Sequence, residues 1–348
     1  MIIFQLKIFV FSKVAMSFLE VLSQHKYINQ NFTFTAEKLP IIRAELLEKL
    51  AHSQYKDKMC IIVTGSYGRY EASSESDMDL FWFIDADIPD EPAEALKEEI
   101  KIINDVIINH VPKEAGSTGT FGPSAIVSQS ELIGNIGGKN DSNENMTRRM
   151  LLLLEGTYLY NNDKFIEIRK NLIDKYIKVE QNPKQIPRFL LNDIIRYYRT
   201  IATDFEFKVS EDSKEWGLRN IKLKFSRKFL YFGGLIAVAE LIHIHDIDAQ
   251  KAKLEEIFDK TVFEKCFLCA RRVDLIPQMN QIFGFYNNFI EKISTPENRI
   301  QLEATTKNTR NDSALYQELR DDGNKFSEAM ELFLTQAFGK QFISLLIF

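Results

Sequence analysis

Two short apolar runs, separated by a polar stretch, constrain the fold of this chain more than any other feature. Residues 60–63 (CIIV) and 79–84 (DLFWFI) are nearly continuous in apolar residues. Strands covered on both faces have this pattern, whereas half-exposed strands alternate. Apolar residues recur near the helical period over residues 37–52, and Gly65 follows the first run as a turn signal. The sequence therefore predicts a helix, a strand, a turn and a second strand, which is an α/β pattern.

The remainder of the chain predicts two domains and an N-terminal extension. Residues 91–109 have a helical stripe, and residues 116–129 read as a loop that leads into a short strand. After Met146, long helical segments are expected at residues 148–161, 187–208 and 218–245. We expect a helical extension over 1–34, an α/β (α+β) domain with a small mixed sheet over 35–145, and an all-helical domain over 146–348.

Composition excludes several classes of protein. The 348 residues carry a formal net charge of −5 and are 45% hydrophobic, which excludes a disordered chain and a broadly basic nucleic-acid coat. The three cysteines, Cys60, Cys266 and Cys269, are too few and too unevenly placed for a secreted disulfide framework. Because we find neither an export signal nor an apolar stretch of about 18 residues, we expect a cytoplasmic protein without a membrane partner.

The polar stretch between the two runs carries residues suited to metal and phosphate chemistry. Gly65 lets the backbone pass close to a ligand, and the hydroxyl of Ser66 can meet phosphate oxygens together with nearby N–H groups. Asp77 and Asp79 are two residues apart at the start of the second run, so their side chains would point to one face with their Cα atoms about 7 Å apart. Paired carboxylates, completed by phosphate oxygens and water, suit Mg²⁺ or Mn²⁺.

This arrangement resembles the DNA polymerase β-like nucleotidyltransferase superfamily, whose signature is Gly-Ser followed by Asp-x-Asp at the start of the next strand. Residues 65–71 (GSYGRYE) and 76–79 (SDMD) are similar to the bacterial branch that contains protein-modifying uridylyl- and adenylyltransferases. The resemblance implies that residues 35–145 are the nucleotidyltransferase domain and that a nucleoside triphosphate (NTP) binds in a cleft between two lobes. It also implies transfer of a nucleoside monophosphate with release of pyrophosphate.

The resemblance implies a role for each residue of the motif. Asp77 and Asp79 would be the catalytic carboxylates and the metal ligands, while Gly65 and Ser66 would bind the nucleotide. One metal ion would lower the pKa of an acceptor hydroxyl, and a second would hold the triphosphate. Arg69 either contacts phosphate or forms a structural ion pair with a nearby acid, and the sequence leaves both open.

Two parts of the expected site are less well defined by the sequence. Many members of the superfamily carry a third carboxylate on a later strand, but residues 120–129 contain no acid, and only Glu114 and Glu131 flank them. Residues 214–228 form a basic helical segment with two possible roles. Either one of its lysines or arginines closes over the triphosphate, or the segment is only a solvated basic face. We select Lys222 as the nucleotide-binding residue of this segment, with Arg219 and Lys224 as rivals.

The expected function is Mg²⁺- or Mn²⁺-dependent nucleotidyl transfer from an NTP to a protein side chain or a small hydroxylated molecule. Two alternatives stay open. The basic helix is also compatible with an RNA end as the acceptor, although the net charge disfavours a nonspecific polymerase. The unassigned third carboxylate also allows a pseudoenzyme that senses nucleotides without turning them over.

Overall fold

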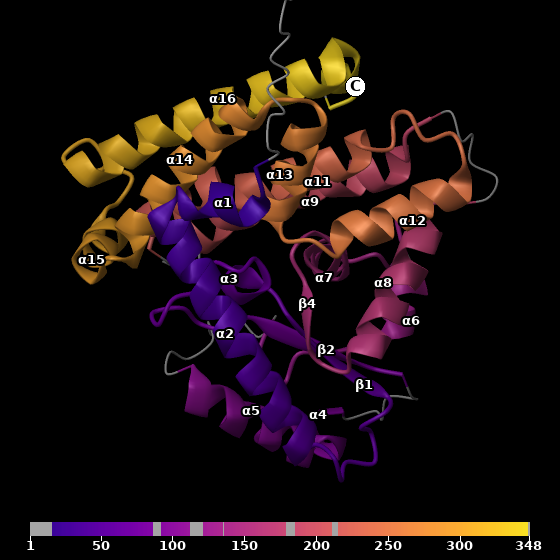
Figure 1. The fold of residues 1–348 in the computed structure, drawn as a ribbon. Coiled ribbons are helices and arrows are strands. Elements are labelled where there is room, and N and C mark those ends of the chain that lie inside the picture. Colours follow the sequence, from indigo (N-terminus) through magenta and orange to yellow (C-terminus); the bar gives the residue numbers. More distant parts are fainter. Residues whose placement is uncertain are drawn as a thin grey trace, which may run out of the picture.

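The computed structural model describes residues 16–85, 92–111, 121–134, 136–178, 185–210 and 215–346. Within these ranges the protein has a mixed α/β fold in which a small sheet is surrounded by helices (Figure 1). The expectation of a mixed fold with a small mixed sheet is thus confirmed. Among the described residues, we find no helix with the length and apolar character needed to span a bilayer.

The sheet has four strands in the order β3-β2-β1-β4, and it brings the two ends of the polar stretch together. Its strands are β1 (Met59–Val63), β2 (Leu80–Ile84), β3 (Ile126–Ser128) and β4 (Thr157–Tyr160). Strand β1 runs antiparallel to β2 and β4, and β2 runs parallel to β3. Because Val63 at the end of β1 pairs with Leu80 at the start of β2, the chain leaves the sheet and re-enters it at neighbouring positions.

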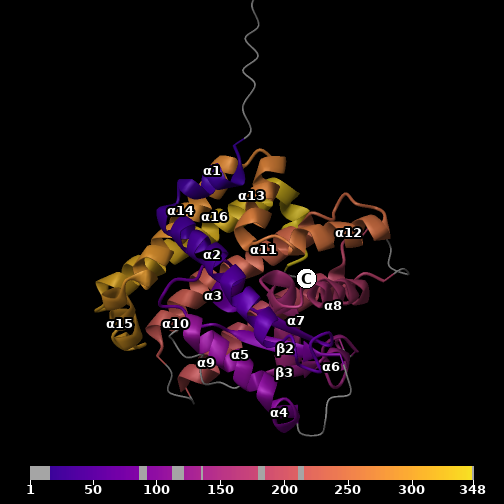
Figure 2. The ribbon, with the colours of Figure 1, turned by 60° about the horizontal axis from the view of Figure 1, so that its bottom comes forward.

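Both faces of the central strands are buried, as their continuous apolar sequence predicts. One face of β1 and β2 packs into the large core of the helical half through Cys60, Ile62, Phe81 and Phe83. The other face packs against α2 (Lys26–Lys49) and α5 (Lys97–His110), with Trp82 fully buried among them. Figure 2 shows α5 at the end of the molecule away from α14 and α16.

The other helices include a long series that forms the C-terminal half. They are α1 (Phe18–Ser23), α3 (Gly65–Gly68), α4 (Pro92–Ala95), α6 (Gln129–Gly134), α7 (Asn143–Leu154), α8 (Asn162–Tyr176), α9 (Arg188–Ser210), α10 (Gly217–Lys222), the π turn η1 (Leu223–Arg227), α11 (Lys228–Ala239), α12 (Ile247–Phe258), α13 (Val262–Arg272), α14 (Ile276–Ser294), α15 (Pro296–Ala304) and α16 (Ala314–Ser344). Segments α10, η1 and α11 follow one another without a break.

Two of the expected domain limits fall inside helices, and one segment expected to be helical is a strand. The expected boundary at residues 34/35 falls inside α2, and the boundary at 145/146 falls inside α7. Residues 157–160, expected to be helical, form β4 instead. A Cβ on Gly156 would lie 2.9 Å from the Leu152 carbonyl oxygen, and the following β-branched and aromatic residues favour a strand. Residues 1–15 of the expected N-terminal extension lie outside the described part of the chain.

Candidate active site

The Gly-Ser turn packs directly against the second aspartate of the motif. The amide of Thr64 donates to the Asp79 carbonyl at 2.8 Å, which holds the two strand ends together. Gly65 then adopts a φ of +66°, and a Cβ built on it would lie 2.7 Å from Oδ2 of Asp79. Only glycine meets both conditions without strain, because other residues rarely adopt this conformation. The glycine is therefore required both for the turn and for the close approach of the carboxylate.

All six residues selected from the sequence line one pocket, which lies between the adjoining ends of strands β1 and β2 and the helical half. The cavity volume is about 90 Å³, and the total empty space is about 680 Å³ when the part open to solvent is included. The lining residues from the first half are Asn31, Gly65, Ser66, Arg69, Glu71, Ser73, Ser76, Asp77 and Asp79, and those from the helical half are Lys222, Ser226, Arg227, Ile290, Ile293, Ser294 and Arg299. Of the three basic candidates, Lys222 lines the pocket, whereas Arg219 and Lys224 do not.

The two aspartates form a crowded pair of negative charges. Burial, and then the charge of Asp77, raises the pKa of Asp79. A cation held between the carboxylates would relieve this repulsion, and carboxylate oxygens are the hard ligands that Mg²⁺ and Mn²⁺ prefer. Among the residues that the structure describes, no group of three or more His, Cys, Asp and Glu side chains is arranged to hold a metal ion. Glu131 does not line the pocket, and Glu114 lies outside the described residues.

Arg69 takes part in a buried network of charges beneath the turn. Its guanidinium donates to Glu71 at 2.9 Å and to Glu155 at 2.5 Å, and its side chain is only 7% exposed. Although burial opposes its charge, Glu71 and Glu155 hold the pKa of Arg69 well above its usual value. The hydroxyl of Tyr286, on α14, donates to the other oxygen of Glu71 at 2.7 Å. Of the two roles considered for Arg69, the structural ion pair is present in the structure.

Glu155 is a site residue that sequence reasoning missed. Its carboxylate accepts the backbone N–H of Gly65 at 2.8 Å as well as the Arg69 guanidinium, and its side chain is fully buried. It also lies 4.0 Å from Arg227, so it joins the end of α7 to the turn and to the helical half. The sequence offered only one signal, an acid between a run of leucines and Gly156, and nothing local linked it to Gly65.

The basic side of the pocket is formed by a π turn in the α10–α11 segment. In a π turn the backbone hydrogen bonds run from i to i+5, so residues five apart lie nearer one face than in an α-helix. This local change allows Lys222, Ser226 and Arg227 to line the same pocket. Phe225 faces inward and stacks on Phe289, with ring centroids 4.6 Å apart. The stacked ring fixes the turn against α14.

Lys222 is held in the pocket as a partly desolvated cation. Burial, and then the positive charge of Arg299, lowers the pKa of Lys222 to about 8. Arg299 comes from α15 and bonds Glu303 at 3.1 Å. Sequence reasoning missed Arg227 and Arg299. Arg227 falls on the site only because of the π turn, and Arg299 is far from the motif in the sequence.

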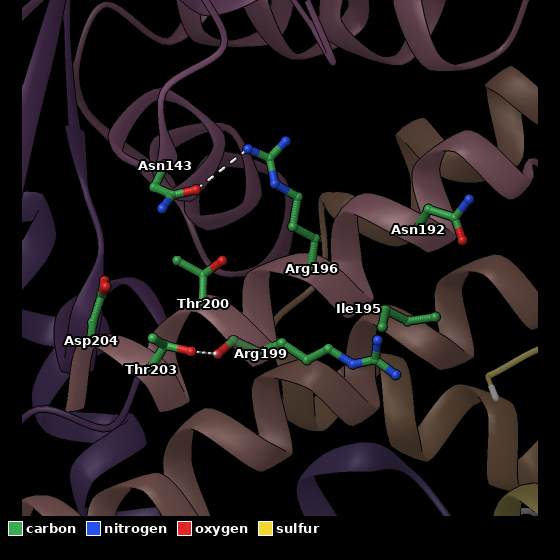
Figure 3. A pocket seen from close by; sticks show the side chains of 8 residues that line it. All are labelled: Asn143, Asn192, Ile195, Arg196, Arg199, Thr200, Thr203 and Asp204. Atoms are coloured by element: carbon green, nitrogen blue, oxygen red, sulfur yellow. Dashed lines mark hydrogen bonds between the residues drawn. The ribbon is translucent and has the colours of Figure 1, made fainter. Parts of the chain in front are cut away.

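A separate groove follows one face of α9 and contains no residue of the motif. It is lined by side chains that include Arg196, Arg199, Thr200 and Asn143. Figure 3 shows the Arg196 guanidinium reaching toward Asn143, which it contacts at 3.4 Å. Arg196 also bonds the buried Asp141 carboxylate at 3.0 Å. The groove lacks the paired acids of the motif, so we place the candidate chemistry in the first pocket.

Comparison of the chain with models of known protein families, and with curated protein sequences, gives no match. Function is therefore inferred from the residues of the pocket, their charges and their contacts.

Proposed function

We propose that the pocket between the ends of β1 and β2 and the helical half binds an NTP with a divalent cation. The protein then transfers the nucleoside monophosphate of this NTP to an acceptor hydroxyl. Pyrophosphate is the leaving group. The acceptor is a protein side chain or a small hydroxylated molecule. In this proposal the small sheet with its flanking helices is a polymerase β-like nucleotidyltransferase domain.

One observation carries the proposal, namely the facing charges of a single pocket. Asp77 and Asp79 stand on the sheet side, and Lys222, Arg227 and Arg299 stand on the helical side. A triphosphate with a bound cation has the matching pattern, because its metal needs carboxylates and its free oxygens need cations. Neither group of residues alone would indicate more than a charged surface.

Asp77 and Asp79 are the residues that would hold the divalent cation. When bound, the metal lowers the pKa of the acceptor hydroxyl and neutralises charge on the leaving pyrophosphate. The side chains of Lys222, Arg227 and Arg299 bind phosphate oxygens, and the Ser66 hydroxyl donates a further hydrogen bond. Glu155 holds the Gly65 amide and so keeps the turn that presents Ser66 in place.

The test measures binding and chemistry separately. Calorimetry with each NTP and Mg²⁺ is followed by a pyrophosphate-release assay in the presence of cell lysate and labelled NTP. We expect micromolar binding and labelling of an acceptor, with label and pyrophosphate lost by at least a hundredfold in Asp77→Asn and Asp79→Asn. Asp85→Asn, an exposed aspartate at the opposite end of β2, is the matched control. Absence of metal-dependent NTP binding by the wild-type protein would rule the proposal out.

A second candidate function, nucleotide sensing without turnover, is favoured by one observation. The remaining acid that lines the pocket, Glu71, is committed to Arg69 and Tyr286 and is not free to act as a base. Tight NTP binding without release of pyrophosphate, under every acceptor condition tried, would support the sensor over the enzyme.

A further inference from the structure

The proposed NTP pocket differs sharply in what it offers to a triphosphate and to a base. Besides Arg69, which is paired with Glu71 and Glu155, its sixteen described lining residues include three cationic side chains and no aromatic ring. Base–aromatic stacking is a common source of base affinity in nucleotide sites. In place of an aromatic ring, the lining has two aliphatic side chains, Ile290 and Ile293 on α14, which offer apolar contact to any base.

Few side chains in the pocket are available to read the edge of a base. The amide of Asn31 donates to the Glu71 carbonyl at 3.0 Å, which fixes its orientation. The hydroxyl of Ser76 accepts the Ser73 amide at 3.0 Å and so belongs to the motif loop. The hydroxyl of Ser73 accepts the Glu75 amide at 3.3 Å, and the hydroxyl of Ser294 can act as donor or acceptor and therefore suits several base edges. Apart from the oriented side chain of Asn31, no fixed donor–acceptor pattern results among the described residues.

The triphosphate, in contrast, meets a fixed set of cations. Arg227 is oriented by Glu155, 4.0 Å away, and Arg299 by Glu303 at 3.1 Å. Lys222 shares their pocket because of the π turn, which Phe225 anchors by stacking. Hydrogen bonds between cationic side chains and phosphate are among the strongest in proteins.

From these contacts we infer that this pocket selects its nucleotide by the number of phosphates and not by the base. The protein accepts ATP, GTP, CTP and UTP with similar affinity, and it binds diphosphates and monophosphates much more weakly. This inference rests on the proposed function, because it concerns the same site. Inorganic tripolyphosphate contains the recognised part of the ligand and competes with every NTP.

The test is competition calorimetry on the full chain with Mg²⁺ and a fixed set of probes: the four NTPs, ADP and tripolyphosphate. We expect the four NTP affinities to agree within threefold, ADP to bind at least tenfold more weakly than ATP, and tripolyphosphate to displace ATP. A tenfold or larger preference for one base, or equal affinity for ADP and ATP, would overturn the inference. Those outcomes leave the proposed function standing, whereas the absence of any NTP binding would remove both.

Matched lysine variants locate the selection in the pocket. Lys222→Met should weaken all four NTPs and tripolyphosphate by the same factor, about tenfold. Lys224→Met changes a lysine two residues away that does not line the pocket, so it should bind all probes like the wild type. A Lys222→Met variant that loses one NTP selectively, or that binds tripolyphosphate as well as the wild type does, would contradict the inference. Circular dichroism of both variants shows whether they fold.

Discussion

Gly65 illustrates how a single position joins backbone geometry to the proposed chemistry. Gly65→Ala places a Cβ only 2.7 Å from Oδ2 of Asp79, at a φ of +66°. The strain is of the order of 1–3 kcal/mol, so we expect lower stability to urea and at least tenfold weaker Mg²⁺–NTP binding. Gly284→Ala is the control, because a Cβ there meets nothing within 4 Å. Unchanged nucleotide affinity in Gly65→Ala would show that the Gly65 turn does not contribute to nucleotide binding.

Lys222 makes nucleotide affinity depend on pH in a direction fixed by its environment. Burial and Arg299 lower its pKa to about 8, so the free protein carries this charge at pH 7 and loses it at higher pH. NTP affinity should therefore fall above pH 8, by up to about tenfold per pH unit for one linked proton. Lys222→Arg should remove this dependence, because arginine stays protonated. Calorimetry between pH 7 and pH 9.5 checks it, and a flat wild-type profile would contradict the assignment.

At this scale the sequence identified the motif residues on the sheet side of the pocket. Gly65, Ser66 and the two aspartates were recognisable because their spacing is local and falls between two strands. Lys222 could be selected only as one of three basic residues, because helical periodicity does not account for a π turn. Glu155 had no local signal, since its partners depend on how α7 meets the sheet.

Among the elements, α14 is tied to the motif loop by one hydroxyl. The Tyr286 hydroxyl donates to the buried Glu71 carboxylate at 2.7 Å across 215 residues of sequence. Tyr286→Phe keeps the ring and removes this donor, so it should lower the free energy of unfolding by about 1–3 kcal/mol. Urea titration measures the change. Tyr316→Phe is the comparison, because Tyr316 bonds a neutral, partly exposed amide at 2.8 Å and should cost less. Equal effects would mean that the charged partner contributes nothing extra.

Secondary structure was predicted correctly where burial of an apolar run dominates. It was predicted wrongly where a local helical pattern competes with strand pairing. Strands β1 and β2 followed from uninterrupted apolar runs, and the structure buries every residue of both. Strand β4 was missed because only Glu155 and Gly156 separate its four residues from the leucine-rich end of α7, and the helical pattern was extended across them. The edge position beside β1 decides its conformation, and this contact is not visible in a local window.

For the whole molecule, the sheet and the helical half share a core. One continuous cluster of buried side chains includes residues of β1 and β2 together with residues from α7 to α16. Helix α2 packs against α5, β4 and α14, and so connects both halves. Domain limits derived from composition therefore fall inside helices, because the change in sequence texture does not coincide with a gap in packing.

This shared core predicts a single unfolding transition that responds to the ligand. An NTP at a hundred times its Kd, with Mg²⁺, should stabilise the protein by about 2.7 kcal/mol and raise the Tm as one transition. Asp79→Asn should abolish the Mg²⁺-dependent part of the shift. Differential scanning calorimetry with EDTA as the control checks this. Two separate transitions, or a shift that persists in EDTA, would contradict it.

The most direct measurement is a crystal structure with Mn²⁺ and a non-hydrolysable NTP analogue, read at the manganese absorption edge. The proposed site predicts an anomalous peak bonded to carboxylate oxygens of both Asp77 and Asp79, with the phosphates between Ser66 and the side chains of Lys222 and Arg227. An analogue bound elsewhere, or a pocket in which manganese touches neither aspartate, would contradict the proposed site.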